Sequence, residues 1–347
     1  MNRNILGKTG IEIPPIIFGT SCFGNLYVAL PWPTKISILN NIFDQMDGQV
    51  VLDTAGKYGA GLALESLGKG LTELNIPTNR VLISNKLGWY RIPLDADEPA
   101  FEPGVWADIK HDAVQKINYD GINDCFNQGR MLLGNRYDTE LVSVHDPDEY
   151  LALSVNESDR QNRLSDIIGA YKALEKLKAD NLVKAIGIGS KDWKVIKEIS
   201  RLVKLDWVML AVSFTLLKHP PELLDFLDEL YQSDIFIINS AVFHAGFLTG
   251  GKYFDYRIPD PADSSDKKLF EWRSKFHDVC RQHNVNPADA CVQFALSHPG
   301  VKSISLNTSK PDRVQQNIQS VQVVIKSDFW EHLKDKQLIS NNYPYLG

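Results

Sequence analysis

The stretch VVLDTAGKYG (50–59) joins an apolar run to a set of polar and small residues, and it decides how the rest of the chain is interpreted. Its first three residues are aliphatic, as expected of a buried strand, and the run then ends in Asp53. A phenol, Tyr58, follows five residues later. Because ligand sites of parallel α/β folds lie at the carboxyl ends of the strands, this acid and phenol indicate a strand end that carries chemistry.

Seven further apolar runs resemble this strand, and amphipathic helical patterns lie between them. Little polar alternation occurs within these runs, which is typical of parallel strands buried on both faces. Leu64, Leu67, Leu71 and Leu74 show the three- and four-residue spacing of one intervening helix. Eight strands that alternate with helices predict a (β/α)8 TIM barrel. We expect its strands at 15–19, 50–54, 81–85, 141–145, 185–189, 207–212, 235–239 and 303–306.

The alternative to a barrel is a doubly wound open sheet, but no GxGxxG motif follows the first strand. The opening segment ILGKTGIEIPPI (5–16) predicts a short hairpin that closes one end of the barrel. The connections at 88–115 and 147–163 are too long for simple turns, and we expect long loops at the C-terminal face. The first is rich in aromatic residues and suits either a self-packed surface loop or a lid over the substrate. Residues 1–347 are expected to form a single domain.

The composition excludes several classes of protein. The formal net charge is -6 and the pI is about 5.8, with no basic block, so neither a nucleic acid nor an anionic membrane is an expected partner. No run reaches the roughly 18 apolar residues of a membrane span, and four scattered cysteines suggest a reducing compartment. We therefore expect a cytoplasmic protein, and the sequence does not indicate its oligomeric state. We expect no metal site, because His145 and Asp146 would lie on opposite faces of a strand.

Polar residues close three consecutive predicted strands. Asp53 and Tyr58 follow the second strand, Lys86 ends the third and His145 ends the fourth. Each residue alone is explained by a cap, by packing or by a surface position. All four together at one end of a barrel are much less easily explained in this way. The sequence therefore predicts a shared site.

The chemistry of these four side chains is consistent with proton transfer. A free Tyr has a pKa of about 10, and an adjacent Lys ammonium favours the phenolate. Asp53 can hold Lys86 in place, and His145 can orient a substrate oxygen by a hydrogen bond. Such a site moves a proton to or from a hydroxyl or carbonyl oxygen. The carbon also has to gain or lose a hydride, which implies a nicotinamide cofactor.

These motifs resemble those of the aldo-keto reductase superfamily over essentially the whole chain. LDTAGKYG (52–59), SNKLG (84–88), LVSVHDPD (141–148) and the C-terminal segment 297–318 carry the resemblance. It implies that Tyr58 is the general acid/base, that Lys86 tunes its pKa, that Asp53 is the partner of Lys86 and that His145 orients the substrate.

The resemblance also implies a cofactor site, with some departures from the usual pattern. Ser190 and Lys191 stand where the family commonly has Ser-Asn, and Ala211 stands where it commonly has Gln, with Ser213 nearby. Near the last helix, Asn307 replaces a Lys that is frequent in NADP-preferring members. The expected cofactor is NADP or NAD, with a slight preference for NADP. The expected cofactor residues are Gly19, Thr20, Ser190, Lys191, Ser213, Ser240, Phe243, Asn307, Thr308, Arg313 and Asn317.

Within the superfamily, segments 118–149 and 208–217 are similar to the branch that oxidises sugars at C1, which includes L-fucose dehydrogenase and D-threo-aldose 1-dehydrogenase, with pyridoxal 4-dehydrogenase as a relative. This resemblance implies oxidation of an L-fucose-like aldose to a lactone. The alternatives are an aldehyde or ketone reductase and, less favoured, a cofactor-binding regulatory subunit. The expected partner is a small sugar or carbonyl substrate, and Trp32 and Trp89 are candidates for stacking on a sugar ring.

Overall fold

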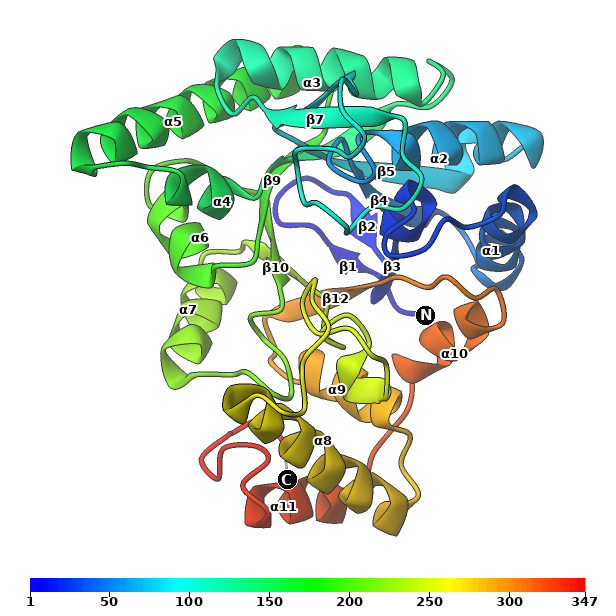
Figure 1. The fold of residues 1–347 in the computed structure, drawn as a ribbon, viewed down its shortest axis with the longest axis vertical. Coiled ribbons are helices and arrows are strands. Elements are labelled where there is room, and N and C mark those ends of the chain that lie inside the picture. The colour runs from blue at the N-terminus through cyan, green and yellow to red at the C-terminus, as the bar shows by residue number, and fades with distance from the viewer. Residues whose placement is uncertain (347) are drawn as a thin grey trace.

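Eight parallel strands form a closed barrel in a computed structural model of the chain that describes residues 1–346 (Figure 1). Each strand pairs with the next barrel strand along the chain, and the last strand pairs with the first. The closed ring confirms the predicted TIM barrel and excludes the open sheet. The barrel strands are β3 (Ile16–Gly19), β4 (Val50–Ala55), β5 (Val81–Leu87), β8 (Thr139–His145), β9 (Ala185–Ser190), β10 (Trp207–Ala211), β11 (Phe236–Ser240) and β12 (Val301–Leu306).

One helix follows each strand and covers the outside of the barrel, where it packs its apolar face against the strands. None of the helices within residues 1–346 is long and apolar enough to cross a membrane. The covering helices are α1 (Trp32–Gln45), α2 (Leu62–Glu73), α3 (Tyr119–Leu132), α5 (Glu157–Ala179), α6 (Trp193–Ser200), α7 (Pro221–Gln232), α9 (Pro287–Ala295) and α10 (Arg313–Ser320). The additional helices are α4 (Pro147–Ala152), α8 (Ser264–His283) and α11 (Ser327–Asp335), with 3-10 turns η1 (Ser21–Gly24), η2 (Thr78–Arg80) and η3 (Phe247–Thr249).

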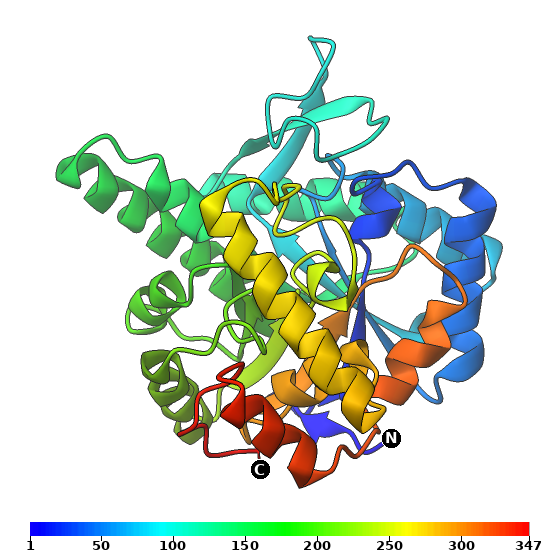
Figure 2. The same cartoon turned by 60° about the horizontal axis from the view of Figure 1, so that its bottom comes forward.

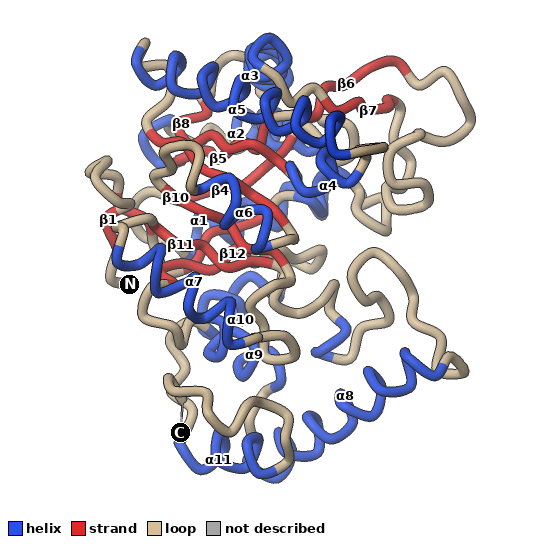
Figure 3. Tube along the Cα trace, turned by 90° about the vertical axis from the view of Figure 1, so that its left-hand side faces the viewer, coloured by secondary structure: helices blue, strands red, loops and turns tan. Residues whose placement is uncertain are grey.

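The N-terminal hairpin fills one end of the barrel, as predicted. Its two strands, β1 (Asn4–Ile5) and β2 (Glu12–Ile13), pair antiparallel. Leu6 and Ile13 are fully buried and pack with side chains of the barrel interior, among them Trp207. Figure 3 shows this hairpin at the opposite end of the barrel from β6, β7 and α8. The hairpin therefore leaves the other end free to form a site.

The first long connection contains a two-stranded sheet, β6 (Trp89–Pro93) paired antiparallel with β7 (His111–Gln115). This segment rises above the barrel at the top of Figure 2. It has a small apolar core of its own, in which Trp89, Phe101 and Trp106 pack together. The half-buried Tyr58 packs against the same cluster. The segment is thus self-packed and also lies against the predicted site.

The prediction of a long loop at 147–163 was wrong, because most of this segment is helical. It contains α4 and the first turns of α5, and the side chain of Asn156 caps α5 by accepting a hydrogen bond from the backbone N–H of Asp159. No residue of α5 before Ile167 is buried, and this part projects from the barrel at the left of Figure 2. A helix with polar residues on all sides lacks the apolar periodicity from which helices are predicted.

Candidate active site

The four predicted residues meet at the carboxyl ends of three adjacent strands. β4 pairs with β5, and β5 pairs with β8, so that Asp53, Lys86 and His145 lie side by side at one end of the barrel. The Lys86 ammonium donates a hydrogen bond to the Asp53 carboxylate and lies 4.8 Å from the ring centre of Tyr58. The rings of Tyr58 and His145 meet edge to face at 5.7 Å. The structure therefore brings together the acid, amine, phenol and imidazole.

Two glycines fix the backbone next to Tyr58. A Cβ on Gly24 would lie 2.6 Å from the carbonyl carbon of Tyr58, and a Cβ on Gly59 would lie 2.2 Å from the oxygen of Gly24. Gly59 also has a φ of +60°, in the left-handed region that favours glycine. Because the two backbones touch directly, η1 holds the turn after β4 in place and so sets the position of the phenol.

Burial of the phenol raises the pKa of Tyr58 well above its usual range. The carboxylates of Asp53 and Asp146 act in the same direction, whereas Lys57 and Lys191 oppose the rise. The sequence predicted that Lys86 would lower this pKa. Burial and the two carboxylates outweigh the effect of the cations, so Tyr58 is a protonated acid at neutral pH.

His145 is buried and neutral. Burial lowers its pKa well below the usual range, and Lys86 acts in the same direction, while Asp146 opposes the shift. Its Nδ1 atom has no hydrogen-bond partner within residues 1–346. His145 also lines the cavity beside Tyr58, and this places the imidazole to meet a substrate oxygen.

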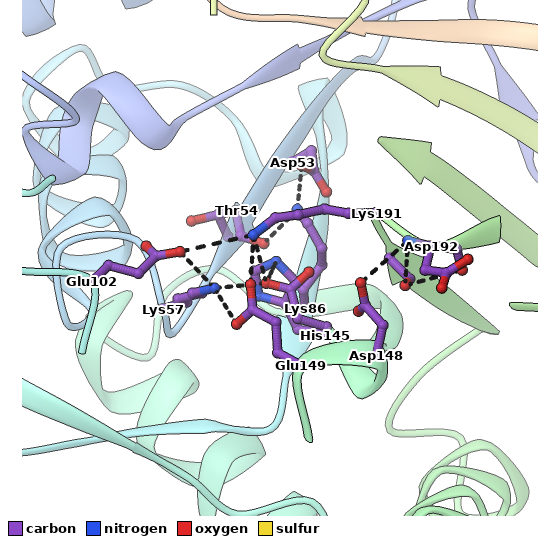
Figure 4. Close-up of polar contacts among 12 residues, drawn as sticks. Asp53, Thr54, Lys57, Lys86, Glu102, His145, Asp148, Glu149, Lys191 and Asp192 are labelled. Carbon is purple, nitrogen blue, oxygen red and sulfur yellow. Dashed lines mark hydrogen bonds and ion pairs between the residues drawn. The ribbon is translucent and has the colours of Figure 1, made fainter. Parts of the chain in front are cut away.

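Lys57 lies next to the four predicted catalytic residues, and the sequence analysis did not identify it. Its side chain is 3% exposed, and its ammonium forms ion pairs with Asp146 and Glu102 at 2.8 Å and with Glu149 at 2.7 Å (Figure 4). Burial alone would lower the pKa of Lys57, but the three carboxylates raise it. Burial would raise the pKa of Asp146, but the cations Lys57 and Lys191 hold it below its usual range. Lys57 and Asp146 therefore both carry their charges in this cluster.

One cavity of about 580 Å³ joins these residues to the C-terminal segment. Its lining includes most of the residues predicted to bind the cofactor, whose roles stay predictions. Those that line it are Gly19, Ser190, Lys191, Ser240, Phe243, Asn307, Thr308, Arg313 and Asn317. The ammonium of Lys191 also pairs with Glu149. Lining residues that the sequence analysis did not predict include Tyr27, Lys57, Glu102, Trp106, Tyr256 and Lys310.

Four predicted residues are not among those that line the cavity. The hydroxyl of Thr20 donates to the backbone oxygen of Asp53, and that of Ser213 donates to the backbone oxygen of Lys191. Both side chains thus hold the backbone of residues that line the cavity.

The two tryptophans proposed to stack on the sugar also lie outside the cavity. Trp32 begins α1, and its indole donates to Glu73 in a separate surface groove. Trp89 is buried in the core of the β6–β7 segment. Trp106, which lines the cavity 5.9 Å from the ring of Tyr58, is an aromatic residue placed to meet a substrate.

His244 fixes the segment after β11 beside the cavity. This fully buried imidazole contacts the Asp255 carboxylate through Nδ1 at 2.9 Å and the Thr215 hydroxyl through Nε2 at 2.9 Å. Phe243 and Tyr256, the neighbours of His244 and Asp255 in sequence, both line the cavity. His244 is therefore structural, and it holds two lining residues in place.

A barrel with an acid–amine–phenol–imidazole site and a cavity leading to a polar C-terminal segment defines an oxidoreductase of the aldo/keto reductase type. The model of the Aldo/keto reductase family matches residues 15–337, so the chain belongs to this family and is an NAD(P)-dependent oxidoreductase.

Characterised relatives match nearly the full length of the chain. It is 28% identical to D-threo-aldose 1-dehydrogenase of Pseudomonas sp, with 95% of this chain and 96% of the relative covered. It is 26% identical to pyridoxal 4-dehydrogenase of Microbacterium luteolum, with 97% and 98% covered. It is 20% identical to L-galactose dehydrogenase of Arabidopsis thaliana, with 91% and 86% covered.

Solved structures confirm the fold. An aldo-keto reductase from Bacillus halodurans superimposes with a TM-score of 0.70 at 18% identity, covering 98% of this chain and 97% of that one. A glycerol dehydrogenase from Gluconobacter oxydans superimposes with a TM-score of 0.71 at 17% identity, covering 99% and 96%.

The residues present fit a nicotinamide dinucleotide. The cavity end formed by 307–317 offers an amide from Asn307, a hydroxyl from Thr308 and the cations Lys310 and Arg313, which are donors that suit phosphate groups. Arg313 also begins α10, whose N-terminus favours an anion. Tyr58 lines the same cavity. The donors for phosphate and the acid thus share one continuous cavity.

Proposed function

We propose that this enzyme oxidises an aldose, with an L-fucose-like sugar as the favoured substrate, at C1 to the lactone. The observation that carries the proposal is the wall of the cavity beside Tyr58, which is built from charged side chains such as Lys57 and Glu102 with the ring of Trp106 among them. Such a wall suits a polyhydroxylated ring better than an apolar carbonyl compound. Two relatives are named for the oxidation of sugars, which supports the same substrate class.

In this proposal, Tyr58 in its phenolate form takes the proton of the C1 hydroxyl. His145 holds the same oxygen by a hydrogen bond, and Lys86, fixed by Asp53, balances the negative charge on the phenolate. A bound nicotinamide cofactor supplies the acceptor for the C1 hydride. Loss of the hydride and the proton leaves a C1 carbonyl, which in a pyranose is the lactone.

The same residues would act in reverse in a reductase. There, protonated Tyr58 gives its proton to a carbonyl oxygen, and enzymes of this family bind small carbonyl substrates. A regulatory subunit would have no use for the intact catalytic residues and is the least favoured alternative.

The function is tested by following the absorbance of reduced nicotinamide with NAD or NADP against a panel of aldoses that includes L-fucose, D-arabinose and L-galactose. Reduction of the cofactor by one class of sugar supports the proposal. If no aldose is oxidised but aldehydes oxidise the reduced cofactor, the enzyme is a reductase. If neither reaction occurs while cofactor binds, the regulatory function is supported.

We expect aldose oxidation to speed up with rising pH between about pH 7 and pH 10. Burial raises the pKa of Tyr58, so the phenolate that accepts the proton is scarce at neutral pH and increases as pH rises. Carbonyl reduction needs the protonated phenol and should decline as pH rises through the same pKa. Profiles of kcat/KM in both directions measure this, and a plateau of oxidation already reached at pH 7 would contradict it.

We also expect NADP to be preferred over NAD, with Arg313 as the main cause. Lys310 lines the same end of the cavity and supplies the second cation that the replacement of Lys by Asn307 removes from the usual pattern. Arg313→Ala should raise the KM for NADP about tenfold and change the KM for NAD much less, because only NADP carries the extra phosphate. Equal effects on both cofactors would contradict recognition of that phosphate by Arg313.

A further inference from the structure

The ion-pair cluster beside Tyr58 contains more carboxylates than ammonium groups. Glu102, Asp146 and Glu149 surround Lys57, and the second cation, Lys191, pairs with Glu149 and lies 3.8 Å from Glu102 (Figure 4). These three carboxylates and two ammonium groups leave one negative charge in excess. Asp146 and Glu149 already pair with Lys57, so the neutralisation of this lysine does not require Glu102.

Glu102 differs from the other two carboxylates in the way it reaches the cavity. It comes from the segment between β6 and β7, and its backbone has a φ of +45°, which is strained for a residue with a side chain. The indole of Trp106 donates to its Oε2 atom at 2.8 Å, and Lys57 lies 2.8 Å from its Oε1 atom. Two fixed donors therefore hold this carboxylate at the cavity wall, with its side chain 17% exposed.

The hydrogen-bonding capacity of Glu102 is not exhausted by these two contacts. Each carboxylate oxygen can accept about two hydrogen bonds, so each keeps about one site for a further donor. Lys57 and Lys191 beside it disfavour a cationic ligand and can donate to a ligand oxygen. Hydroxyl groups both donate and accept, and the adjacent ring of Trp106 offers a face for the C–H groups of a sugar.

We propose that Glu102 determines substrate specificity by accepting hydrogen bonds from hydroxyl groups on the carbons next to the reacting carbon. This inference rests on the proposed function, because it assigns a substrate class to the same site. It explains why a charged side chain with a strained backbone lies beside the phenol. It also predicts that Glu102 discriminates between carbonyl compounds with and without neighbouring hydroxyls.

The test compares the reduction of D-glyceraldehyde and propanal, which have the same chain length and differ in their hydroxyl groups. Glu102→Gln keeps an oxygen for the Trp106 indole but removes the charge. We expect kcat/KM for D-glyceraldehyde to decrease about tenfold, mainly through KM, and kcat/KM for propanal to stay within about twofold. Glu98→Gln, an exposed glutamate of the same segment, is the matched control and should change neither value.

Equal losses for D-glyceraldehyde and propanal, or no loss for either, would overturn the inference. If Glu102→Gln fails to fold, Trp106→Phe replaces it, because this change removes the donor that holds Glu102; it should shift the same ratio in the same direction. Aldose oxidation by the wild type is measured separately. Its absence would refute the proposed function, while the D-glyceraldehyde to propanal ratio would still decide the role of Glu102.

Discussion

Tyr58→Phe should lower kcat by about 100- to 10,000-fold in either direction of the reaction. The change removes only the hydroxyl that exchanges a proton with the substrate oxygen, and the ring keeps its contacts with His145 and Trp106. The dissociation constant for the cofactor should stay within about twofold, because the expected phosphate donors Asn307, Thr308, Lys310 and Arg313 are unchanged. Steady-state kinetics and fluorescence titration with the cofactor measure both quantities.

The thermal unfolding of Tyr58→Phe serves as its control, because an unchanged transition shows that the loss of rate does not come from loss of fold. A variant that folds normally and keeps more than about a tenth of the wild-type kcat would contradict the role of Tyr58 as acid and base.

Lys86→Met should reduce both activity and stability. The side chain of Lys86 is 4% exposed and that of Asp53 is 3% exposed, so the variant leaves a buried carboxylate without its cation. Breaking a buried ion pair in this way costs about 3–5 kcal/mol in the free energy of unfolding. The loss of positive charge beside Tyr58 should also lower kcat for oxidation by about 100-fold. Denaturant unfolding and kinetics measure the two effects.

The double variant Asp53→Asn/Lys86→Met separates these two effects. It removes both charges and should recover most of the free energy of unfolding that Lys86→Met loses. Its activity should stay low, because the ammonium beside the phenolate is still missing. If activity returned together with stability, Lys86 would be a structural residue.

The barrel strands could be predicted because burial on both faces requires an apolar run, which is visible in the local sequence. A strand such as β4 is buried on both faces and needs an unbroken apolar run. The proposed catalytic residues Asp53, Lys86 and His145 could be found for a related reason. They interrupt or close such runs, and the carboxyl ends of neighbouring parallel strands must meet.

Lys57 and Glu102 could not be identified in this way. Lys57 stands in a conspicuous motif, but its partners Asp146 and Glu149 are 89 and 92 residues away in sequence. Glu102 lies in a segment whose path over the barrel is set by its own apolar core. The one available signal for the ion-pair cluster was Lys57 itself, because a lysine in an otherwise buried turn needs a counter-ion.

Trp32 lies outside the cavity for a different reason. The residues between the first barrel strand and Trp32 carry the chain to the start of α1, where the indole donates to Glu73. Nearness to a strand end in sequence therefore locates a side chain only while the chain stays in the strand or in the first few residues after it.

The pairing of β12 with β3 affects how the protein folds during its synthesis. All four proposed catalytic residues lie before residue 146, but the barrel cannot close until β12 fills the gap between β11 and β3. At about 5–20 residues per second, roughly ten to thirty seconds separate the synthesis of His145 from that of Leu306. During this time the nascent chain can present β3 as an unpaired strand edge, which makes it a natural client for chaperones near the ribosome.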